Sequence, residues 1–134
     1  RYFRFMDALR ELPKALLVRF TQLDYQREMA IIALTGTNGQ EEQIGVARYA
    51  TSPDGESCEF ALVIADDWQR RGLGKALMQY LMQIASSRGL KVMEGEVLAN
   101  NPNMLRLMTS LGFSAETAAG DPAIRIVTAS LSST

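Results

Sequence analysis

The spacing of apolar residues predicts a strand, a helix and three further strands in the first half of the chain. Residues 1–5 alternate and are rich in aromatics, as in a short strand, whereas leucine and phenylalanine recur at helical spacing over residues 9–23. Pro13 falls in the first turn of this predicted helix, where its missing N–H costs nothing. Three strand-like runs and two turns follow: runs 28–35, 43–51 and 57–65, and turns 36–39 and 52–55. We expect the three runs to form a meander.

In the second half of the chain, helical and strand-like spacing alternate. An apolar face with helical spacing runs through residues 73–88, and residues 90–99 resemble the next strand. Asn101 can cap a short helix that has Pro102 at its first position. Residues 114–131 are expected to form a closing hairpin. The order of elements predicts an α/β (α+β) fold with a mixed central sheet of about six to seven strands flanked by helices.

Length and composition fit one globular domain over residues 1–134. Apolar residues make up 47% and charged residues 22% of the chain, and the formal net charge is −1, so no broad basic face for nucleic acid is expected. No apolar run approaches the roughly 18 residues of a membrane span, and no signal peptide is visible, so we expect no membrane contact and a cytoplasmic location. The chain starts at Arg1 without a methionine, which suggests a domain excised from a longer protein.

The chain has one cysteine, Cys58, and no histidine. These counts exclude an internal disulfide, Cys–His clusters, most zinc sites and every histidine-dependent catalytic triad. Asp66 and Asp67 are adjacent, but no third ligand is spaced to complete a metal site, so no metal is expected. Nothing near Cys58 in the sequence would lower the pKa of its thiol, which indicates a buried small residue.

The stretch QRRGLG at residues 69–74 is the strongest candidate for ligand binding. It follows one predicted strand and begins the predicted helix 73–88. Glycines allow close approach of the backbone to an anion, and the free N–H groups of a helix start point toward it. Arg70, Arg71 and Lys75 add positive charge at the same end. The stretch predicts a pyrophosphate site, although taken alone it equally fits an ordinary glycine-rich turn that begins an amphipathic helix.

Together with NNPN at residues 100–103 and LGF at 111–113, this stretch resembles the acetyl-CoA site of the GNAT superfamily of N-acetyltransferases. The resemblance covers residues 44–113, and it implies a GNAT fold and acetyl-CoA as cosubstrate. Backbone N–H groups of residues 62–64 would then bind the pantetheine arm and the thioester oxygen, if their strand splays from its neighbour. Asn101 either bonds the pantetheine arm, caps its helix, or does both. The expected cofactor-binding residues are Leu62, Val63, Ile64, Gln69, Arg70, Arg71, Gly72, Leu73, Gly74, Lys75 and Asn101.

Acetyl transfer to an amine needs a base, because only about one lysine in two thousand is neutral at pH 7. Without histidine, the base is a carboxylate, a tyrosine or water. Glu59 interrupts an apolar strand just before the glycine turn, where partial desolvation would raise the pKa of its carboxyl. The alternation of Glu59 with Phe60 fits a solvated residue on a polar face equally well. Glu96 and then Glu94, on the next predicted strand, are the further candidates.

More narrowly, the sequences at residues 19–30, 45–48 and 58–61 resemble the acetyltransferase domain of bacterial Pat-type protein lysine acetyltransferases. The resemblance implies acetylation of a lysine on AMP-forming acyl-CoA synthetases such as acetyl-CoA synthetase, which switches them off. It also implies Glu59 as catalytic glutamate and an N-terminal domain similar to NDP-forming acyl-CoA synthetases.

One position departs from the superfamily pattern. Many GNAT enzymes carry, four residues before the Gly-Phe pair, a tyrosine that protonates the departing thiolate, and this chain has Met108 there. Another group then protonates coenzyme A, or the thiolate leaves unaided. Other functions also fit the pattern: acetylation of a small amine, a module that senses acetyl-CoA without turnover, or a plain interaction domain.

Overall fold

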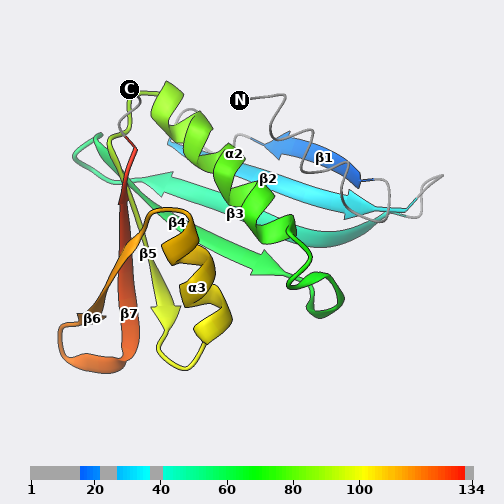
Figure 1. Ribbon diagram of the computed structural model, residues 1–134. Helices are drawn as coiled ribbons and strands as arrows, with labels where there is room; N and C mark the ends of the chain where they lie inside the picture. Colours follow the sequence, from blue (N-terminus) through cyan, green and yellow to red (C-terminus); the bar gives the residue numbers. More distant parts are fainter. Residues whose placement is uncertain (1–15, 22–26, 37–40, 132–134) are drawn as a thin grey trace.

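The computed structural model describes residues 16–21, 27–36 and 41–131, which form one seven-stranded sheet with helices packed against it (Figure 1). The strand order is β1-β2-β3-β4-β5-β7-β6, and every neighbouring pair is antiparallel except β4 and β5. The predicted mixed sheet is therefore confirmed. The elements are β1 (Leu16–Thr21), β2 (Glu28–Thr35), β3 (Glu42–Thr51), β4 (Ser57–Ile64), η1 (Asp66–Trp68), α2 (Leu73–Ser87), β5 (Val92–Leu98), α3 (Pro102–Ser110), β6 (Ser114–Ala118) and β7 (Asp121–Ser130).

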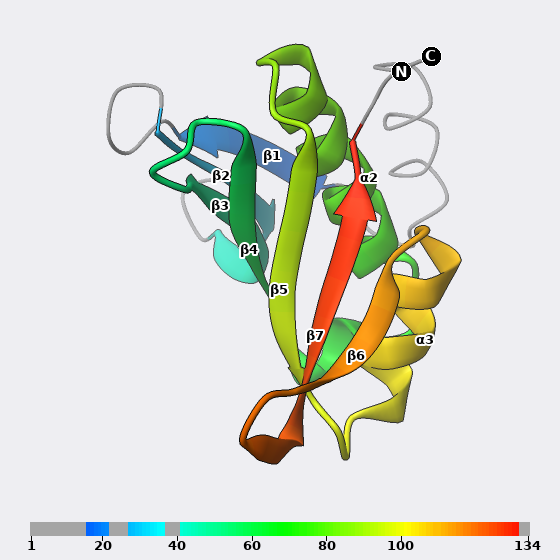
Figure 2. The same cartoon turned by 90° about the vertical axis from the view of Figure 1, so that its left-hand side faces the viewer.

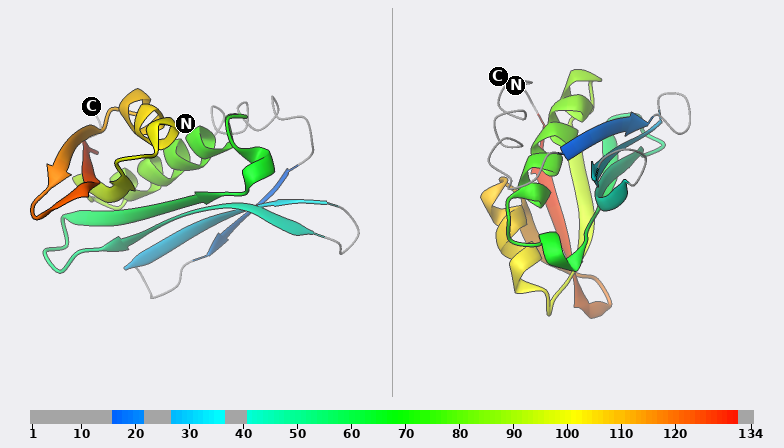
Figure 3. Two further views of the ribbon diagram at one scale, coloured as in Figure 1. Left: turned by 90° about the horizontal axis from the view of Figure 1, so that it is seen from below. Right: turned by 90° about the vertical axis from the view of Figure 1, so that its right-hand side faces the viewer.

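In the described part of the chain, both α-helices lie on the same face of the sheet (Figure 3). Helix α2 packs on β2, β3 and β4, and α3 packs on β6. Strand alternation turns Cys58 and Phe60 of β4 toward the helices and into the core, while Glu59, Ala61 and Val63 are exposed. We call the opposite surface the open face; its residues on β4 and β5 are Glu59, Ala61, Val63, Glu94, Glu96 and Leu98.

The start of the described chain differs from the prediction. Residues 16–21 form strand β1, where helical spacing predicted part of a helix over residues 9–23. β1 pairs antiparallel with β2 through all six of its residues. Periodicity alone cannot separate a short apolar strand from a helix segment, and pairing with β2 decides the outcome here. The predicted strand over residues 1–5 and the remainder of that helix lie outside the described residues.

The second half of the chain follows the prediction closely. Helix α2 covers the predicted helical run, and Asn101 caps α3 by accepting a hydrogen bond from the Met104 N–H at 3.1 Å. β6 and β7 form the predicted closing hairpin, and Figure 2 displays β5, β7 and β6 side by side. No helix in the described ranges is long and apolar enough to cross a membrane.

The parallel pair at the centre of the sheet comes apart after three residues. Register pairs run from Ser57↔Val92 to Glu59↔Glu94 only. Beyond them β4 continues to Ile64 beside β3, whereas β5 continues to Leu98 beside β7, so the two strands diverge (Figure 1). The splay that a pantetheine arm requires is therefore present between β4 and β5.

Candidate active site

Backbone donors of β4 face the gap between β4 and β5. The Ala65 N–H donates to the Ile44 carbonyl of β3 at 2.9 Å. Because backbone N–H groups of successive strand residues point to opposite edges, the N–H of Val63 also points toward β3, and those of Leu62 and Ile64 point into the gap. Of the three donors expected from the sequence, two therefore have the required direction, and Val63 does not.

The turn after η1 is fixed to the end of β4. The Gln69 side-chain nitrogen donates to the Ile64 carbonyl at 3.1 Å and to the Asp66 carboxylate at 3.3 Å. Arg70 and Gly72 have positive φ, of 62° and 89°, a conformation that costs a non-glycine residue about 1–2 kcal/mol. Left-handed residues in a turn can direct neighbouring N–H groups to one side, which makes a concavity suited to an anion.

Helix α2 begins directly after this turn, with Gly72 as its N-cap. The first-turn N–H groups, including those of Gly74 and Lys75, have no partner within the helix. With the positive end of the helix dipole, they provide donors suited to an anion next to the exposed side chains of Arg70 and Lys75. The sequence prediction of a cationic helix start after a glycine turn is thus found in the structure.

Arg71 is held away from this anion site. Its guanidinium carbon lies 4.5 Å from the centroid of the Trp68 ring, and its Nη1 donates to the Asp67 carbonyl at 3.1 Å. Trp68 is itself buried in the core. Arg71 therefore links the turn to Trp68 and Asp67, and the cofactor contact expected for its side chain stays a prediction.

A cavity of about 350 Å³ lies between the turn and α3. Gly74 forms part of its wall, and a Cβ there would lie 3.3 Å from the Leu107 side chain and 3.5 Å from that of Leu62. Any larger residue would narrow the passage between α2, α3 and β4. The lining residues are Leu62, Ile64, Gln69, Arg70, Gly72, Gly74, Lys75, Asn101, Asn103, Met104 and Leu107.

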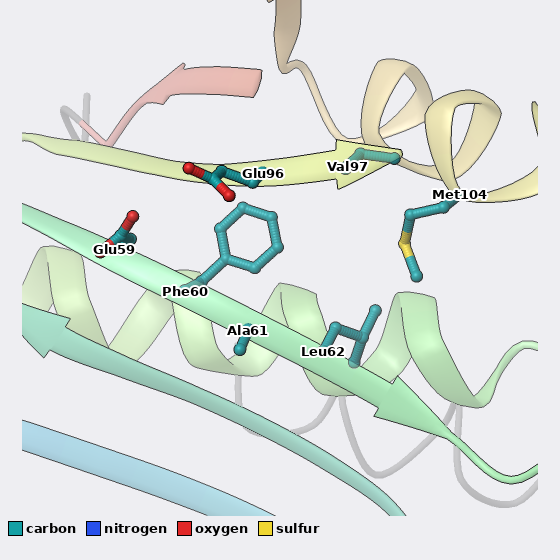
Figure 4. A pocket seen from close by; sticks show the side chains of 7 residues that line it. All are labelled: Glu59, Phe60, Ala61, Leu62, Glu96, Val97 and Met104. Atoms are coloured by element: carbon teal, nitrogen blue, oxygen red, sulfur yellow. The ribbon is translucent and has the colours of Figure 1, made fainter. Parts of the chain in front are cut away.

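A second cavity, of about 340 Å³, lies within the gap (Figure 4). Leu62 and Met104 line both cavities, so the two adjoin at these side chains. Figure 4 shows the Phe60 ring between β4 and β5, with Met104 at the wide end of the gap. The carboxylates of Glu59 and Glu96 stand near the narrow end. The lining residues are Glu59, Phe60, Ala61, Leu62, Glu96, Val97 and Met104.

The three candidate bases lie together on the open face. Glu59 and Glu94 are register partners across the last paired position, and Glu96 follows two residues later on β5. All three side chains are exposed, so the partial burial expected for Glu59 is not found. Glu94 does not line the cavity in the gap, which leaves Glu59 and Glu96 beside it.

Most of the residues predicted to bind the cofactor gather around the first cavity, and three do not. Val63 is 67% exposed on the open face, Leu73 is fully buried in the core, and Arg71 stacks on Trp68. The residues that sequence reasoning missed are Phe60 on β4 and three residues of α3, Asn103, Met104 and Leu107. The i, i+3 spacing of Met104 and Leu107 places them on one helix side, but that spacing fits a core face equally well.

Splayed strands, a helix start with free N–H groups and two adjoining cavities are features that the binding of an acyl-coenzyme A would require. The chain belongs to the acetyltransferase (GNAT) family, whose profile matches residues 4–113. It is therefore an acetyltransferase domain, and the family implies acetyl-CoA as acyl donor.

Comparisons with known proteins show several acetyltransferases to which the chain is similar. Acetyltransferase PA5475 of Pseudomonas aeruginosa is 38% identical over 113 residues, which cover 84% of this chain and 61% of that protein. Acetyltransferase Pat of Mycolicibacterium smegmatis is 29% identical over 111 residues, covering 82% of this chain and 33% of Pat. The crystal structure of the GNAT domain of S. lividans PAT has the same fold, with a TM-score of 0.68 at 23% identity, covering 84% of this chain and 65% of that one. The chain thus spans less than two thirds of each relative.

The site fits the shape and charge of acetyl-CoA. The first cavity lies within the roughly 300–1,000 Å³ of small-molecule sites, and its cationic end at Arg70 and Lys75 suits a pyrophosphate. The gap-facing N–H groups of Leu62 and Ile64 are two residues, or about 7 Å, apart along β4. Their spacing suits a chain that carries successive amide and thioester oxygens.

Proposed function

We propose that this domain transfers the acetyl group of acetyl-CoA to the side-chain amine of a protein lysine, with Glu59 as general base. The observation that carries the proposal is the gap between β4 and β5. On the side of the helices, the gap adjoins the cavity beside the proposed anion-binding turn. On the open face, exposed carboxylates lie beside the gap. An acyl donor and an amine acceptor can therefore approach the same point from opposite faces.

In this mechanism, acetyl-CoA supplies the activated acyl group. The turn and the start of α2 hold the pyrophosphate, and the Leu62 N–H donates to the thioester oxygen as negative charge develops there. Loss of one such donor costs about 3–4 kcal/mol of barrier in other acyl-transfer enzymes. Glu59 takes a proton from the lysine ammonium, directly or through water, so that the neutral amine attacks the carbonyl carbon. The amide bond forms as the carbon–sulfur bond breaks, coenzyme A leaves as its thiolate, and the second proton of the amine passes to water.

We further propose that the thiolate leaves without a dedicated hydroxyl donor. Met108 is 1% exposed in the core and lines neither cavity. In the described part of the chain, the residues that line the two cavities include no tyrosine, serine, threonine or cysteine. A free thiol has a pKa of about 8.5, so its thiolate is a tolerable leaving group near neutral pH.

We propose that the acceptor is a lysine of an AMP-forming acyl-CoA synthetase. Two observations support a lysine acceptor. One is the similarity to Pat from M. smegmatis and to the GNAT domain of S. lividans PAT. The other is charge: Glu59, Glu94 and Glu96 are exposed close together, and a negative surface attracts a cationic side chain and speeds its encounter.

The test is mass spectrometry of an AMP-forming acyl-CoA synthetase incubated with this domain and acetyl-CoA. The proposal predicts acetylation of one active-site lysine, with loss of synthetase activity, and no acetylation when that lysine is replaced by arginine. Transfer to small amines without transfer to the synthetase would favour a small-molecule acceptor. Binding of acetyl-CoA without transfer to any amine would favour a regulatory module that senses the cofactor.

A further inference from the structure

The Phe60 ring closes the narrow end of the gap between β4 and β5 (Figure 4). It is 7% exposed and projects from β4 toward the neighbouring Gly95 of β5. A Cβ built on Gly95 would lie 2.5 Å from Cε2 of the ring, which is closer than real side chains approach. The ring therefore lies directly on the Gly95 backbone and spans the gap from one strand to the other.

Two neighbours keep the ring in this position. Gly95 forms the surface beneath it, and the Phe113 ring packs against it with centroids 5.4 Å apart and planes tilted by 60°. Phe60 and Phe113 both belong to the hydrophobic core. Because the core is close-packed, the ring cannot move aside without displacing other side chains.

The ring also lies on the path of the acyl group. In the proposed binding mode, the chain of acetyl-CoA passes Ile64 and then Leu62 on its way to the narrow end of the gap. Side chains two residues apart on a strand share a face and are about 7 Å apart, so Phe60 comes next in the row after Leu62. Leu62 lines both cavities, whereas Phe60 lines only the one within the gap.

We propose that Phe60 sets the acyl-chain length that the enzyme accepts. An acetyl group ends beside the ring, while each additional methylene of a propionyl or butyryl group meets its face. The proposal rests on the placement of acyl-CoA in the gap described under the proposed function. One methylene too many in an apolar pocket commonly changes discrimination by about 10–200-fold, so the wild-type protein is expected to bind butyryl-CoA at least about tenfold more weakly than acetyl-CoA.

The test compares the dissociation constants of acetyl-, propionyl- and butyryl-CoA by calorimetry, which requires no acceptor. Phe60→Ala is expected to raise the affinity for butyryl-CoA relative to acetyl-CoA by about tenfold or more. Phe60→Leu keeps most of the core volume, and it is expected to shift the ratio in the same direction by a smaller factor. Phe113→Leu is the matched control, because it loosens the same core but lines neither cavity.

An unchanged ratio in Phe60→Leu, with wild-type folding by circular dichroism, would overturn the proposal. A ratio that shifts equally in Phe113→Leu would also overturn it, because general loosening of the core would then explain the change. Failure of the wild-type protein to bind any acyl-CoA would refute the underlying placement. Failure to acetylate a synthetase, with acyl-CoA binding intact, would affect only the choice of acceptor.

Discussion

The two sides of the gap between β4 and β5 differ in how firmly their residues are held. On the helix side, Gln69 bonds to the end of β4, Arg71 bonds to Asp67 and stacks on Trp68, and Asn101 caps α3. On the open face, Glu59, Glu94 and Glu96 are exposed and make no hydrogen bond or ion pair within the described residues. In the proposed function, this difference corresponds to a preorganised donor site opposite an acceptor surface that the partner itself must complete.

The largest expected effect is on kcat, and it should distinguish Glu59 from its register partner Glu94 on the open face. Glu59→Gln should lower kcat by about a hundredfold or more at pH 7, the usual effect of removing a general base, while the KM for acetyl-CoA changes little. Glu94→Gln removes the same charge from the register partner, which lies outside the cavity, and should lower kcat only a few-fold. Steady-state kinetics check this. Equal losses in both variants would mean that charge alone, and no specific base, is at work.

The second-largest effect is expected on acetyl-CoA affinity when a glycine with left-handed φ is replaced by alanine, and two such glycines should differ. Gly72 in the cofactor turn has φ of 89°, and Gly120 between β6 and β7 has φ of 78°. Alanine at either position costs about 1–2 kcal/mol of backbone strain. Gly72→Ala should weaken acetyl-CoA binding about tenfold, the equivalent of about 1.4 kcal/mol, and Gly120→Ala should leave binding unchanged. Calorimetry and thermal unfolding together measure both quantities; an equal change in affinity would remove any special role for the turn.

A smaller effect is expected at Arg71. Its replacement tests whether Arg71 supports acetyl-CoA binding by holding the turn in position or by its charge. Arg71→Lys keeps the charge but loses the planar stack on Trp68, so acetyl-CoA binding should weaken about threefold, in line with exposed cation–π contacts of about 0.5–1 kcal/mol. Arg71→Met should have a similar effect. Full activity of Arg71→Lys beside a strong defect in Arg71→Met would instead indicate direct contact of the charge with phosphate.

The smallest effect on activity is expected at Cys58, which adjoins Glu59 in sequence but lies on the buried face of β4. Burial, with a smaller contribution from the Glu94 carboxylate, raises the pKa of the thiol to about 12. The unfolded thiol ionises near pH 8.5, so the stability from this group is complete below that pH and is lost as the pH rises toward 12. Urea midpoints between pH 7 and 10 should fall in the wild-type protein and fall less in Cys58→Ala, with kcat unchanged. An equal fall of the urea midpoint with pH in the two proteins would contradict the burial of the Cys58 thiol.

The elements on the helix side of the gap could be predicted from the sequence, because the residues that determine them are adjacent in the chain. A glycine turn between a strand and a helix start, and the pair Asn101-Pro102, carry their geometry in a few adjacent residues. The different positions of Arg70 and Arg71 could not be predicted in this way. Arg70 lines the first cavity and Arg71 stacks on Trp68, and this depends on the left-handed φ of Arg70 and on the position of the Trp68 ring.

Other features depend on contacts between distant segments. Residues 16–21 become a strand because β2 offers an edge to pair with, which no local spacing records. The unsuitable direction of the Val63 N–H follows from the register of β4 on β3. Phe60 appears in sequence as one more core residue, and only the close approach of Gly95 reveals that its ring spans the gap.

The most direct test of the gap as the acyl-donor site is residue-resolved amide hydrogen exchange by NMR, with and without acetyl-CoA. Saturating acetyl-CoA should slow exchange at Leu62 and Ile64, whose N–H groups face the gap. Exchange at Val63, whose N–H already faces β3, should change little. Unchanged exchange at Leu62 and Ile64 while acetyl-CoA is bound would show that the cofactor does not occupy the gap between β4 and β5.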